Sequence, residues 1–413
     1  MPALMPESDS EDELPPAWEE RATSDGFVYY VNHQSKSTQW THPRTGKMKR
    51  VSGELPLGWT RHIEEETRKV IFVEEKTQRK SYTDPRLAFA VEEAPEQVGE
   101  LRQRFDSGTN ALQVLHGRDL NGMVALITGA NTGIGFETAR SLALHGCEVV
   151  FACRDEKATQ VAIERIRTEK EAAGARCSFV SLDLASLRST KRAAEEMKKR
   201  HKHINMLILN AGVFALPHSI TEDGFERTFQ VNHLSHFYLT QLLSDLYDHA
   251  TRIVVVSSES HRMSTLPVGG GLSESDLCPP QHKFWSMIAY NNSKLCNVLF
   301  AMELAKRWKS RGISVFVLHP GNMVSSALSR NWWFYRFLFG LVRPFTKSLQ
   351  QAASTTVYCA TAYELTGLTA LYFNNCYVCD PSGTSKSEQL QQSLWELSDK
   401  MIQRVMGEQA DAE

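Results

Sequence analysis

Tyr290 and Lys294, four residues apart, are the side chains in this sequence best suited to acid–base chemistry. On a helix, residues at this spacing project from one face. A free tyrosine has a pKa of about 10 and exchanges protons poorly at neutral pH, but a nearby ammonium favours the phenolate and lowers that pKa. Tyr290 is therefore expected to give a proton to a carbonyl oxygen as hydride arrives, or to take one from an alcohol. The competing interpretation is a chance pair on a helix surface.

A serine is expected to complete this group. Ser258 ends the apolar run RIVVVSS and can hydrogen-bond the same substrate oxygen as the tyrosine. Ser257 is the neighbouring candidate. We assign the role to Ser258, because it matches the second serine of the strand-end pair in the family described below.

A glycine-rich stretch, TGANTGIG at Thr128–Gly135, follows the apolar run MVALI. Gly129 can take a tight turn because it lacks a Cβ, Gly133 lets the backbone approach a bulky ligand, and Gly135 permits close contact of helix and sheet. A helix that starts near Ile134 would aim its free N–H groups and positive dipole end at a pyrophosphate. The alternative is a loop used only for turning.

The elements that must hold these residues are strands alternating with helices. From residue 121 onward, β-branched runs of strand length alternate with helical stretches, and the runs are VALIT, EVVFAC, CSFVSLDL, INMLILN, RIVVVSS and ISVFVLHP. Such alternation predicts an α/β domain over residues 121–413, a Rossmann-type doubly wound parallel sheet with helices on both faces.

Over residues 121–375 the sequence resembles the short-chain dehydrogenase/reductase family. The matches, in the family's order, are the Thr128–Gly135 loop, Asp183-Leu184, Asn210-Ala211-Gly212, Asn232, Ser258, Tyr290-x-x-x-Lys294 and Pro320-Gly321. The resemblance implies a catalytic set of Ser258, Tyr290 and Lys294, with Asn232 holding a water that links the lysine to solvent. The threonine often found just beyond Pro320-Gly321 is Val324 here.

The resemblance also implies a nicotinamide cofactor, held by Gly129, Ala130, Asn131, Thr132, Gly133, Ile134, Gly135, Arg154, Asp183, Asn210, Tyr290 and Lys294. An acidic side chain at the end of the second strand would bind the ribose 2′-hydroxyl of NAD. Cys153 and Arg154 stand there instead, and the Arg154 guanidinium suits the 2′-phosphate of NADP. NADP is therefore expected, although Asp155 keeps NAD open and a solvated arginine is the alternative.

The substrate is expected to be a small apolar carbonyl or alcohol. The 32 residues between Ser258 and Tyr290 resemble the retinol-dehydrogenase-like branch of the family. The apolar segment 331–345, NWWFYRFLFGLVRPF, lies where the family caps its substrate, which suits a steroid-like or retinoid-like molecule. Core packing, a subunit contact and interfacial membrane binding are the alternatives for this segment.

Residues 14–47 resemble a WW domain, a three-stranded antiparallel sheet. Trp18 and Trp40 are 22 residues apart, and Pro43 follows three residues later. The resemblance implies a buckle of Trp18, Tyr29 and Pro43 on one face. On the other face, Tyr30, His33 and Trp40 would bind Pro-Pro-x-Tyr peptides, which are rigid and bind at low entropic cost. The alternative is that all the aromatic residues are structural.

Residues 55–88 repeat this module in a degenerate form. Phe72 takes the place of the groove tyrosine, Tyr82 that of the second tryptophan and Glu75 that of the histidine. A groove that has lost its indole and its histidine is expected to bind ligand weakly or not at all, and to support the first module.

The remaining segments set the domain limits. Residues 1–13 are acidic and expected to be disordered, with Ser8 and Ser10 as possible phosphorylation sites, and residues 89–120 are expected to be a linker. GKMKR at 46–50 is interpreted as solvated linker, with nuclear import as the alternative. The single CxxC pair, Cys376 and Cys379, is too little for a zinc site, so no metal is expected.

Composition excludes other classes of protein. The net charge of −2 gives no basic field for nucleic acid, and the chain has no run of 18 apolar residues that would form a transmembrane helix. The scattered cysteines suit a reducing, cytoplasmic environment.

Two WW modules before a short-chain reductase resemble adaptor enzymes of the cytoplasm, nucleus and mitochondrion that act in transcription, apoptosis and Wnt signalling. The alternative is a signalling scaffold that binds nucleotide with little turnover.

Overall fold

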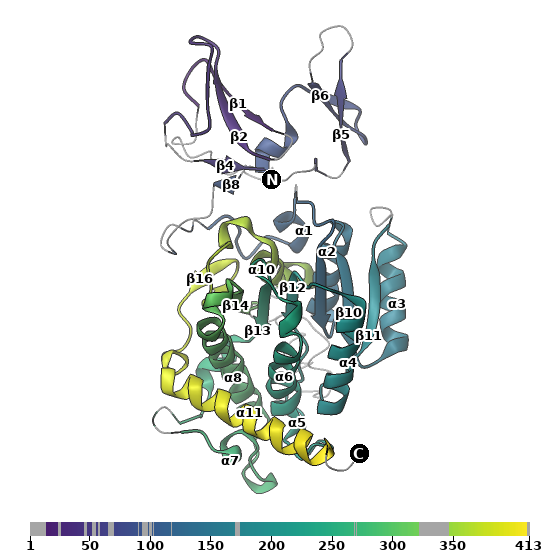
Figure 1. The fold of residues 1–413 in the computed structure, drawn as a ribbon, viewed down its shortest axis with the longest axis vertical. Helices are drawn as coiled ribbons and strands as arrows, with labels where there is room; N and C mark the ends of the chain where they lie inside the picture. The colour runs from purple at the N-terminus through teal and green to yellow at the C-terminus, as the bar shows by residue number, and fades with distance from the viewer. Residues whose placement is uncertain are drawn as a thin grey trace. The chain divides into compact units, whose positions relative to one another are not determined.

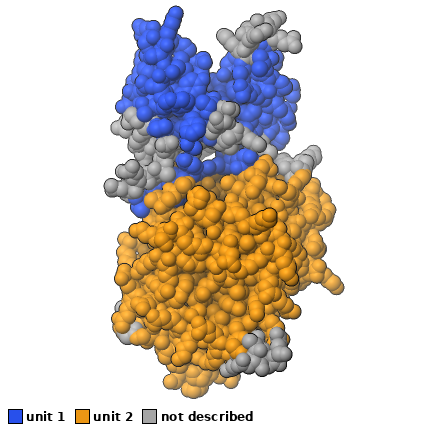
Figure 2. Space-filling model, viewed as in Figure 1, with its two compact units in different colours: residues 1–101, 116–119, 363–365 blue, residues 102–115, 120–362, 366–413 orange. Residues whose placement is uncertain are grey.

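The computed structural model describes residues 14–23, 26–44, 48–51, 55–56, 58–64, 70–89, 91–92, 98, 101, 103–116, 118–169, 174–267, 269, 271–321 and 347–410. They divide into two compact units, shown in Figure 2. The first contains residues 1–101, 116–119 and 363–365, and the second contains residues 102–115, 120–362 and 366–413. The acidic start, Val324 and the apolar segment 331–345 lie outside the described residues.

The first unit contains the two expected three-stranded antiparallel sheets. One has the order β1-β2-β3, with β1 (Trp18–Ala22), β2 (Val28–Asn32) and β3 (Ser37–Gln39). The other has the order β5-β6-β7, with β5 (Trp59–Ile63), β6 (Val70–Glu74) and β7 (Arg79–Ser81). The degenerate second module therefore keeps the fold of the first. A short ladder of β4 (Lys49–Arg50) and β8 (Val91–Glu92) and the 3-10 helix η1 (Pro85–Phe89) complete the unit.

The second unit is built on an eight-stranded sheet of order β11-β10-β9-β12-β13-β14-β15-β16 (Figure 1). Its strands are β9 (Val124–Thr128), β10 (Glu148–Cys153), β11 (Cys177–Ser181), β12 (Met206–Leu209), β13 (Arg252–Val256), β14 (Ser314–His319), β15 (Leu371–Asn374) and β16 (Tyr377–Cys379). All neighbours are parallel except β15 and β16, which form a hairpin. All six residues of β14 are buried, as expected for a parallel strand covered on both faces.

Helices cover both faces of this sheet, which confirms the predicted doubly wound fold (Figure 1). Their bounds are α2 (Gly133–Leu144), α3 (Glu156–Arg167), α4 (Leu187–Arg200), α5 (Arg227–Phe229), α6 (Ser235–Leu242), α7 (Glu274–Leu277), α8 (Ser286–Arg307), α10 (Leu349–Thr361) and α11 (Glu388–Ala410). Helix α2 packs against α3 and α10, whereas α4 packs against α6, and α11 contacts α4, α6 and α8. The strand order reverses between β9 and β12, so the carboxyl ends of these strands form the topological switch point where such folds bind ligands.

Part of the segment expected to be linker is folded with the second unit. Helix α1 (Ala111–Val114) carries a capping box formed by Asn110 and Gln113, and it packs against α2 and α10. Ala111 and Leu115 are fully buried. This burial orders residues that the polar composition of the segment did not reveal, so residues 103–115 are not a simple spacer.

The cysteine pair at the end of the sheet has a structural explanation. Asn375 and Cys376 form the two-residue turn of the β15–β16 hairpin, both with positive φ, as this tight type of hairpin turn requires. Cys376 is buried, and its thiol bonds the hydroxyls of Ser354 and Thr355. Among the described residues no group of three or more His, Cys, Asp or Glu side chains is placed to hold a metal ion.

Candidate functional site

Helix α8 (Ser286–Arg307) places Tyr290 and Lys294 on one face, as their spacing predicts. The lysine is buried, with 4% of it exposed, and its Nζ lies 5.7 Å from the centre of the Tyr290 ring. Ser258 follows β13 and hydrogen-bonds the tyrosine hydroxyl. The edge of the Phe214 ring meets the other side of the tyrosine, at 4.8 Å between ring centres. The structure thus brings together a phenol, an ammonium and a hydroxyl from separate elements.

The electrostatics of this group differ from the expectation that Lys294 lowers the pKa of the tyrosine. Burial raises the pKa of Tyr290 to about 12, and only the hydrogen bond from Ser258 opposes that rise. Burial likewise lowers the pKa of Lys294 to about 8. The lysine Nζ donates to the carbonyl of Val256 at 3.0 Å. Desolvation therefore outweighs charge attraction, and the phenol keeps its proton at neutral pH.

The two candidate serines have different roles. Ser257 is buried, and its hydroxyl donates to the Lys294 carbonyl at 2.7 Å, so it braces helix α8. The Ser258 oxygen accepts the Ser260 amide at 3.3 Å. The Ser258 hydroxyl proton can therefore point at Tyr290, which supports the choice of Ser258 for the substrate oxygen.

Asn232 lies in a single π-helical turn, Gln230–Leu234, a rare conformation that is frequent at functional sites. Its side-chain oxygen accepts the Val213 amide at 2.7 Å, and its nitrogen donates to the Val213 carbonyl at 3.0 Å and to Ser293 at 2.9 Å. Ser293 in turn donates to the Tyr290 carbonyl at 2.7 Å. Both amide protons are thus committed to protein atoms. The side chain of Asn232 therefore braces the helix that carries the tyrosine, and its expected part in holding a water stays a prediction.

Two residues that the sequence analysis did not single out connect this brace to the glycine turn. His236 Nδ1 donates to the Asn232 carbonyl at 3.2 Å, and its Nε2 accepts the Thr128 hydroxyl at 2.9 Å. The Thr128 oxygen also accepts the amides of Asn210 and Ala211, each at 3.0 Å. The signal was present in the sequence, since Thr128 ends β9 and His236 lies one turn beyond Asn232. That these two side chains form a hydrogen bond can be seen only in the folded structure, because they are 108 residues apart in the sequence.

The glycine turn has the shape of an anion cradle. Gly129 and Gly133 have φ of 65° and 62°, where glycine is favoured. A Cβ at Gly135 would lie 2.4 Å from the Gly129 carbonyl oxygen and 2.5 Å from Asn210 Nδ2, so the helix touches the turn there. No heavy atom lies within 4 Å of a Cβ built on Gly133. Thr132, the N-cap of α2, makes no side-chain capping bond. The space beside Gly133, at the start of α2, is therefore open.

The other expected loop residues lie around this turn. Ala130 is fully buried, Asn131 and Ile134 are partly buried, and the Asn210 side chain donates to the Thr128 carbonyl at 3.0 Å. These contacts hold the turn against the end of β12. They fit a pyrophosphate at the start of α2.

The ends of β10 and β11 carry the residues expected near the adenosine. Arg154 is exposed directly after β10, and within the described part of the chain it forms no ion pair. Asp155 is the N-cap of α3 and accepts the Ala158 amide at 3.0 Å. Asp183 accepts the Ala185 amide at 2.9 Å. The arginine is thus available to an anion, whereas the adjacent carboxylate is engaged in capping.

The first WW module requires a correction. Tyr30 is fully buried in the small core with Val28, so it cannot line an exposed groove. Tyr29 is the residue whose ring packs edge-on against Trp40, at 5.8 Å, and Trp40 is 53% exposed. Side chains alternate between the faces of a strand, so assigning the groove to the wrong member of a Tyr-Tyr pair exchanges the faces.

Beside this aromatic pair lies a chain of charged groups. His33 Nε2 lies 2.6 Å from a Glu19 carboxylate oxygen, and Arg21 donates twice to the same carboxylate, each time at 3.0 Å. Arg21 also hydrogen-bonds Tyr29. The exposed face of the first module is therefore a continuous strip from His33 to Trp40.

The second module needs the same correction. Phe72 takes the position of Tyr30 in the strand pairing, which is the core position of the first module, so it is not the groove residue; Phe72 and Ile71 are both buried here. Its neighbour Ile71 takes the position of Tyr29, and Tyr82 takes that of Trp40. Tyr82 is 62% exposed, and its hydroxyl bonds Glu64. An isoleucine and a tyrosine thus replace the tyrosine and tryptophan of the first module.

Comparison with known proteins agrees with both units. A family model for the short chain dehydrogenase matches residues 123–268, and one for the WW domain matches residues 14–43. A solved structure of an uncharacterized protein from Mycobacterium Paratuberculosis superposes with a TM-score of 0.56 at 28% identity, and the match covers 69% of this chain and 95% of that one.

Within the described residues, none of the helices has an apolar stretch long enough to span a lipid bilayer.

Relatives share the whole arrangement. The chain is 64% identical to the WW domain-containing oxidoreductase of Drosophila melanogaster, over 97% of this chain and 98% of the relative. It is 50% identical to the human protein of that name, over 99% and 98%. Retinol dehydrogenase 12 of Mus musculus is 38% identical over 73% of this chain and 92% of its own length. The chain therefore belongs to the WW domain-containing oxidoreductases, in which a WW domain is joined to a short-chain dehydrogenase/reductase.

Proposed function

We propose that the second unit reduces an apolar carbonyl, or oxidises the matching alcohol, with NADP. The observation that carries this proposal is the group formed by Ser258, Tyr290 and Lys294, which the brace of Asn232 and His236 connects to the glycine turn. When bound, the nicotinamide supplies or accepts the hydride.

The protein residues handle the proton and orient the substrate. Tyr290, protonated at neutral pH, donates its proton to the substrate oxygen in the reductive direction. Ser258 donates a hydrogen bond to the same oxygen. Lys294 lies beside the Gly212 backbone, since a Cβ built there would be 3.6 Å from the lysine Nζ. Its ammonium provides positive charge where the proton leaves the phenol.

Arg154 supports NADP over NAD. Arg154 is exposed at the end of β10, where the adenosine ribose lies in this fold. Its guanidinium group can hold a phosphate with two parallel hydrogen bonds. Asp155 is occupied as a helix cap. Asp183 and the glycine turn would hold the rest of the adenosine and the pyrophosphate.

The substrate is proposed to be retinoid-like or steroid-like. Phe214 packs against Tyr290, and Phe284 stacks edge-on against His218 at 5.0 Å. An aromatic side chain thus lies directly beside the reactive phenol. The identity to retinol dehydrogenase 12 points to the same substrate class.

The test is hydride transfer from NADPH to a panel of steroid and retinoid carbonyls. Tyr290→Phe is the control, and it should remove turnover while NADPH still binds. Turnover that survives this substitution would reject the assigned acid. If the wild type binds NADPH but reduces no member of the panel, the second unit is a nucleotide-binding scaffold.

We also propose that the first WW module binds Pro-Pro-x-Tyr peptides through Tyr29 and Trp40, with His33 contacting the ligand tyrosine. The exposed, edge-packed pair supports this proposal. Tyr29→Ala should weaken a Pro-Pro-x-Tyr peptide by roughly 10-fold or more, as expected for an aromatic anchor. The control is Tyr30→Phe, which keeps the core ring and should change the affinity less than about twofold. The reverse result would restore Tyr30 as the groove residue.

The cellular compartments and signalling roles rest on the family resemblance alone and stay predictions.

A further inference from the structure

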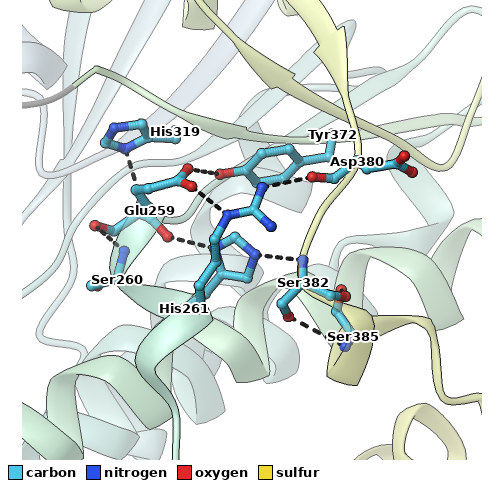
Figure 3. A network of polar contacts seen from close by, with 10 residues as sticks. Glu259, Ser260, His261, His319, Tyr372, Asp380, Ser382 and Ser385 are labelled. Atoms are coloured by element: carbon cyan, nitrogen blue, oxygen red, sulfur yellow. Dashed lines mark hydrogen bonds and ion pairs between the residues drawn. The ribbon is translucent and has the colours of Figure 1, made fainter.

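A polar network lies directly beyond Ser258, where the chain enters the 3-10 helix η6 (Glu259–Met263) (Figure 3). His261, in this helix, is 1% exposed. Its Nδ1 is 2.8 Å from the Ser258 carbonyl oxygen, and its Nε2 is 3.0 Å from the Ser382 amide nitrogen. One imidazole therefore joins the serine of the candidate active site to a segment 121 residues later in the chain.

The two partners fix the protonation state of this ring. A carbonyl oxygen only accepts, so Nδ1 must carry a proton; a backbone N–H only donates, so Nε2 must be bare. His261 is therefore the neutral Nδ1–H tautomer. A second proton on Nε2 would face the Ser382 N–H and break that bond.

The surroundings hold the ring in place. The His261 ring lies 5.2 Å from that of Tyr372 on β15, and the Tyr372 hydroxyl donates to Glu259 at 3.2 Å. Arg262 pairs with Glu259 and donates to the Asp380 carbonyl at 2.6 Å.

Two further contacts fix the ends of the network. From the end of β14, His319 Nδ1 accepts the Glu259 amide at 3.2 Å. The Ser385 hydroxyl donates to the Ser382 carbonyl at 2.6 Å, so the segment that supplies the histidine's second partner is itself ordered. The ring thus bridges two segments that are each held in place.

We propose that His261 is a positioning residue that fixes the Ser258 backbone, and with it the hydroxyl that meets Tyr290 and the substrate oxygen. This inference rests on the proposed function of Ser258. The ring acts as a neutral clamp: its Nδ1 side sets the serine, and its Nε2 side anchors the clamp to residue 382.

The clamp is expected to open in acid. Burial lowers the pKa of His261, and the hydrogen bond to the Ser258 carbonyl opposes this effect. The charge of Arg262 lowers the pKa further, whereas that of Glu259 raises it. The clamp is thus intact at neutral pH and is lost only as the pH falls below the ordinary histidine pKa of about 6.5. The other charged groups on the side of Ser382 are Lys386 and Asp380, which form an ion pair at 2.6 Å.

A matched pair of substitutions separates the two bonds. The amide nitrogen of His261→Asn can replace Nδ1 and keep the bond to Ser258, whereas the amide oxygen of His261→Gln can replace Nε2 and keep the bond to Ser382. In single-turnover hydride transfer, we expect the Gln variant to lose roughly 10- to 100-fold in rate, and the Asn variant to stay within about threefold at neutral pH. The affinity for NADPH should be unchanged in both. Equal losses in the two variants, or no loss in either, would overturn the proposal.

The pH profile gives a readout that general destabilisation would not change. Protonation of Nε2 breaks the Ser382 bond and leaves the Nδ1–H bond to Ser258, so the wild-type rate should fall in acid by no more than about the threefold expected for the Asn variant. The Asn variant, which has no imidazole, should lack that fall. His203→Asn, which removes a partly exposed histidine beside Asp248, should keep the wild-type profile. An unchanged acid limb in His261→Asn would count against the clamp.

Two measurements need no turnover and so separate this inference from the proposed function. Nitrogen NMR of labelled histidine should show His261 as the Nδ1–H tautomer, assigned by its absence in the Asn variant. Hydrogen exchange at the Ser382 amide should quicken in the Asn variant and stay slow in the Gln variant. An Nε2–H signal, or equal exchange in the two, would reject the clamp. If these results hold and no substrate turns over, only the enzymatic proposal fails.

Discussion

The two glycines that begin helix α2 provide the sharpest test of the cofactor cradle. Gly133 and Gly135 are two residues apart, but an added methyl group meets different surroundings at each. At Gly133 it enters open space, and its penalty comes from the φ of 62°. At Gly135 it would lie 2.4 Å from a backbone oxygen, closer than real Cβ atoms come.

These geometries give different expectations for the two alanine variants. Gly133→Ala should cost about 1 kcal/mol of stability, the usual penalty for a side chain in the left-handed region. Its methyl group would occupy the space proposed for the pyrophosphate, so NADPH affinity should fall by roughly 100-fold. Gly135→Ala forces the helix away from the Gly129 carbonyl and should cost about 3 kcal/mol, the upper range for overpacking.

The assay is urea unfolding followed by helical circular dichroism, with NADPH titration of the folded protein. The helical signal reports on the second unit, because both WW modules are β-sheets. The reasoning fails if Gly133→Ala binds NADPH as the wild type does, since the open space would then not be the phosphate site. It fails equally if Gly135→Ala is as stable as Gly133→Ala.

Three further predictions concern single charges. Arg154→Ala should weaken NADPH by about 10- to 100-fold, the value of charge-assisted hydrogen bonds to a phosphate, and leave NADH unchanged in the same titration. Burial lowers the pKa of His236 to about 4, so below about pH 6.5 this histidine takes up a proton in the unfolded chain but not in the folded protein. Its contribution to stability should fall by roughly 2 kcal/mol from pH 7 to pH 5. His233, whose pKa burial lowers to about 3, adds a similar loss, so in urea unfolding His236→Gln should remove about half of the pH dependence of this pair. Lys294, with a pKa of about 8, loses its charge as the pH rises, so kcat/KM should fall above about pH 8, and Lys294→Arg should move this limb to higher pH in steady-state profiles.

Much of the site could be predicted because its residues follow regular elements. The spacing of Tyr290 and Lys294 puts them on one face of any helix, and Ser258 comes directly after a buried strand. The carboxyl ends of parallel strands meet at one edge of a sheet, which brings such residues near the glycine turn. The pairings of Thr128 with His236 and of His261 with Ser382 were beyond sequence reasoning, because each joins segments more than a hundred residues apart.

The WW groove shows where a correct pattern gives a wrong residue. The alternation of Val28, Tyr29 and Tyr30 fixes that the two tyrosines face opposite sides, but it does not say which side is the core. Burial in the folded module decides: Tyr30, which pairs with Glu20 and Gln39, is fully buried, whereas Tyr29, which pairs with Arg21, packs against the exposed Trp40. A sheet this small has few apolar residues to mark its inner face. The sequence therefore predicted the alternation of the side chains correctly but assigned the two faces the wrong way round.

The error in the tyrosine pKa has a physical lesson for the mechanism. Spacing along a helix predicts that Lys294 is near Tyr290, and Coulomb attraction then favours the phenolate, but burial acts on both groups at once. It raises the pKa of the phenol to about 12 and lowers that of the ammonium to about 8. Near neutral pH the phenol therefore keeps its proton. That form needs no prior activation to protonate the oxygen of a carbonyl that gains hydride, so burial favours reduction as the direction in which Tyr290 acts.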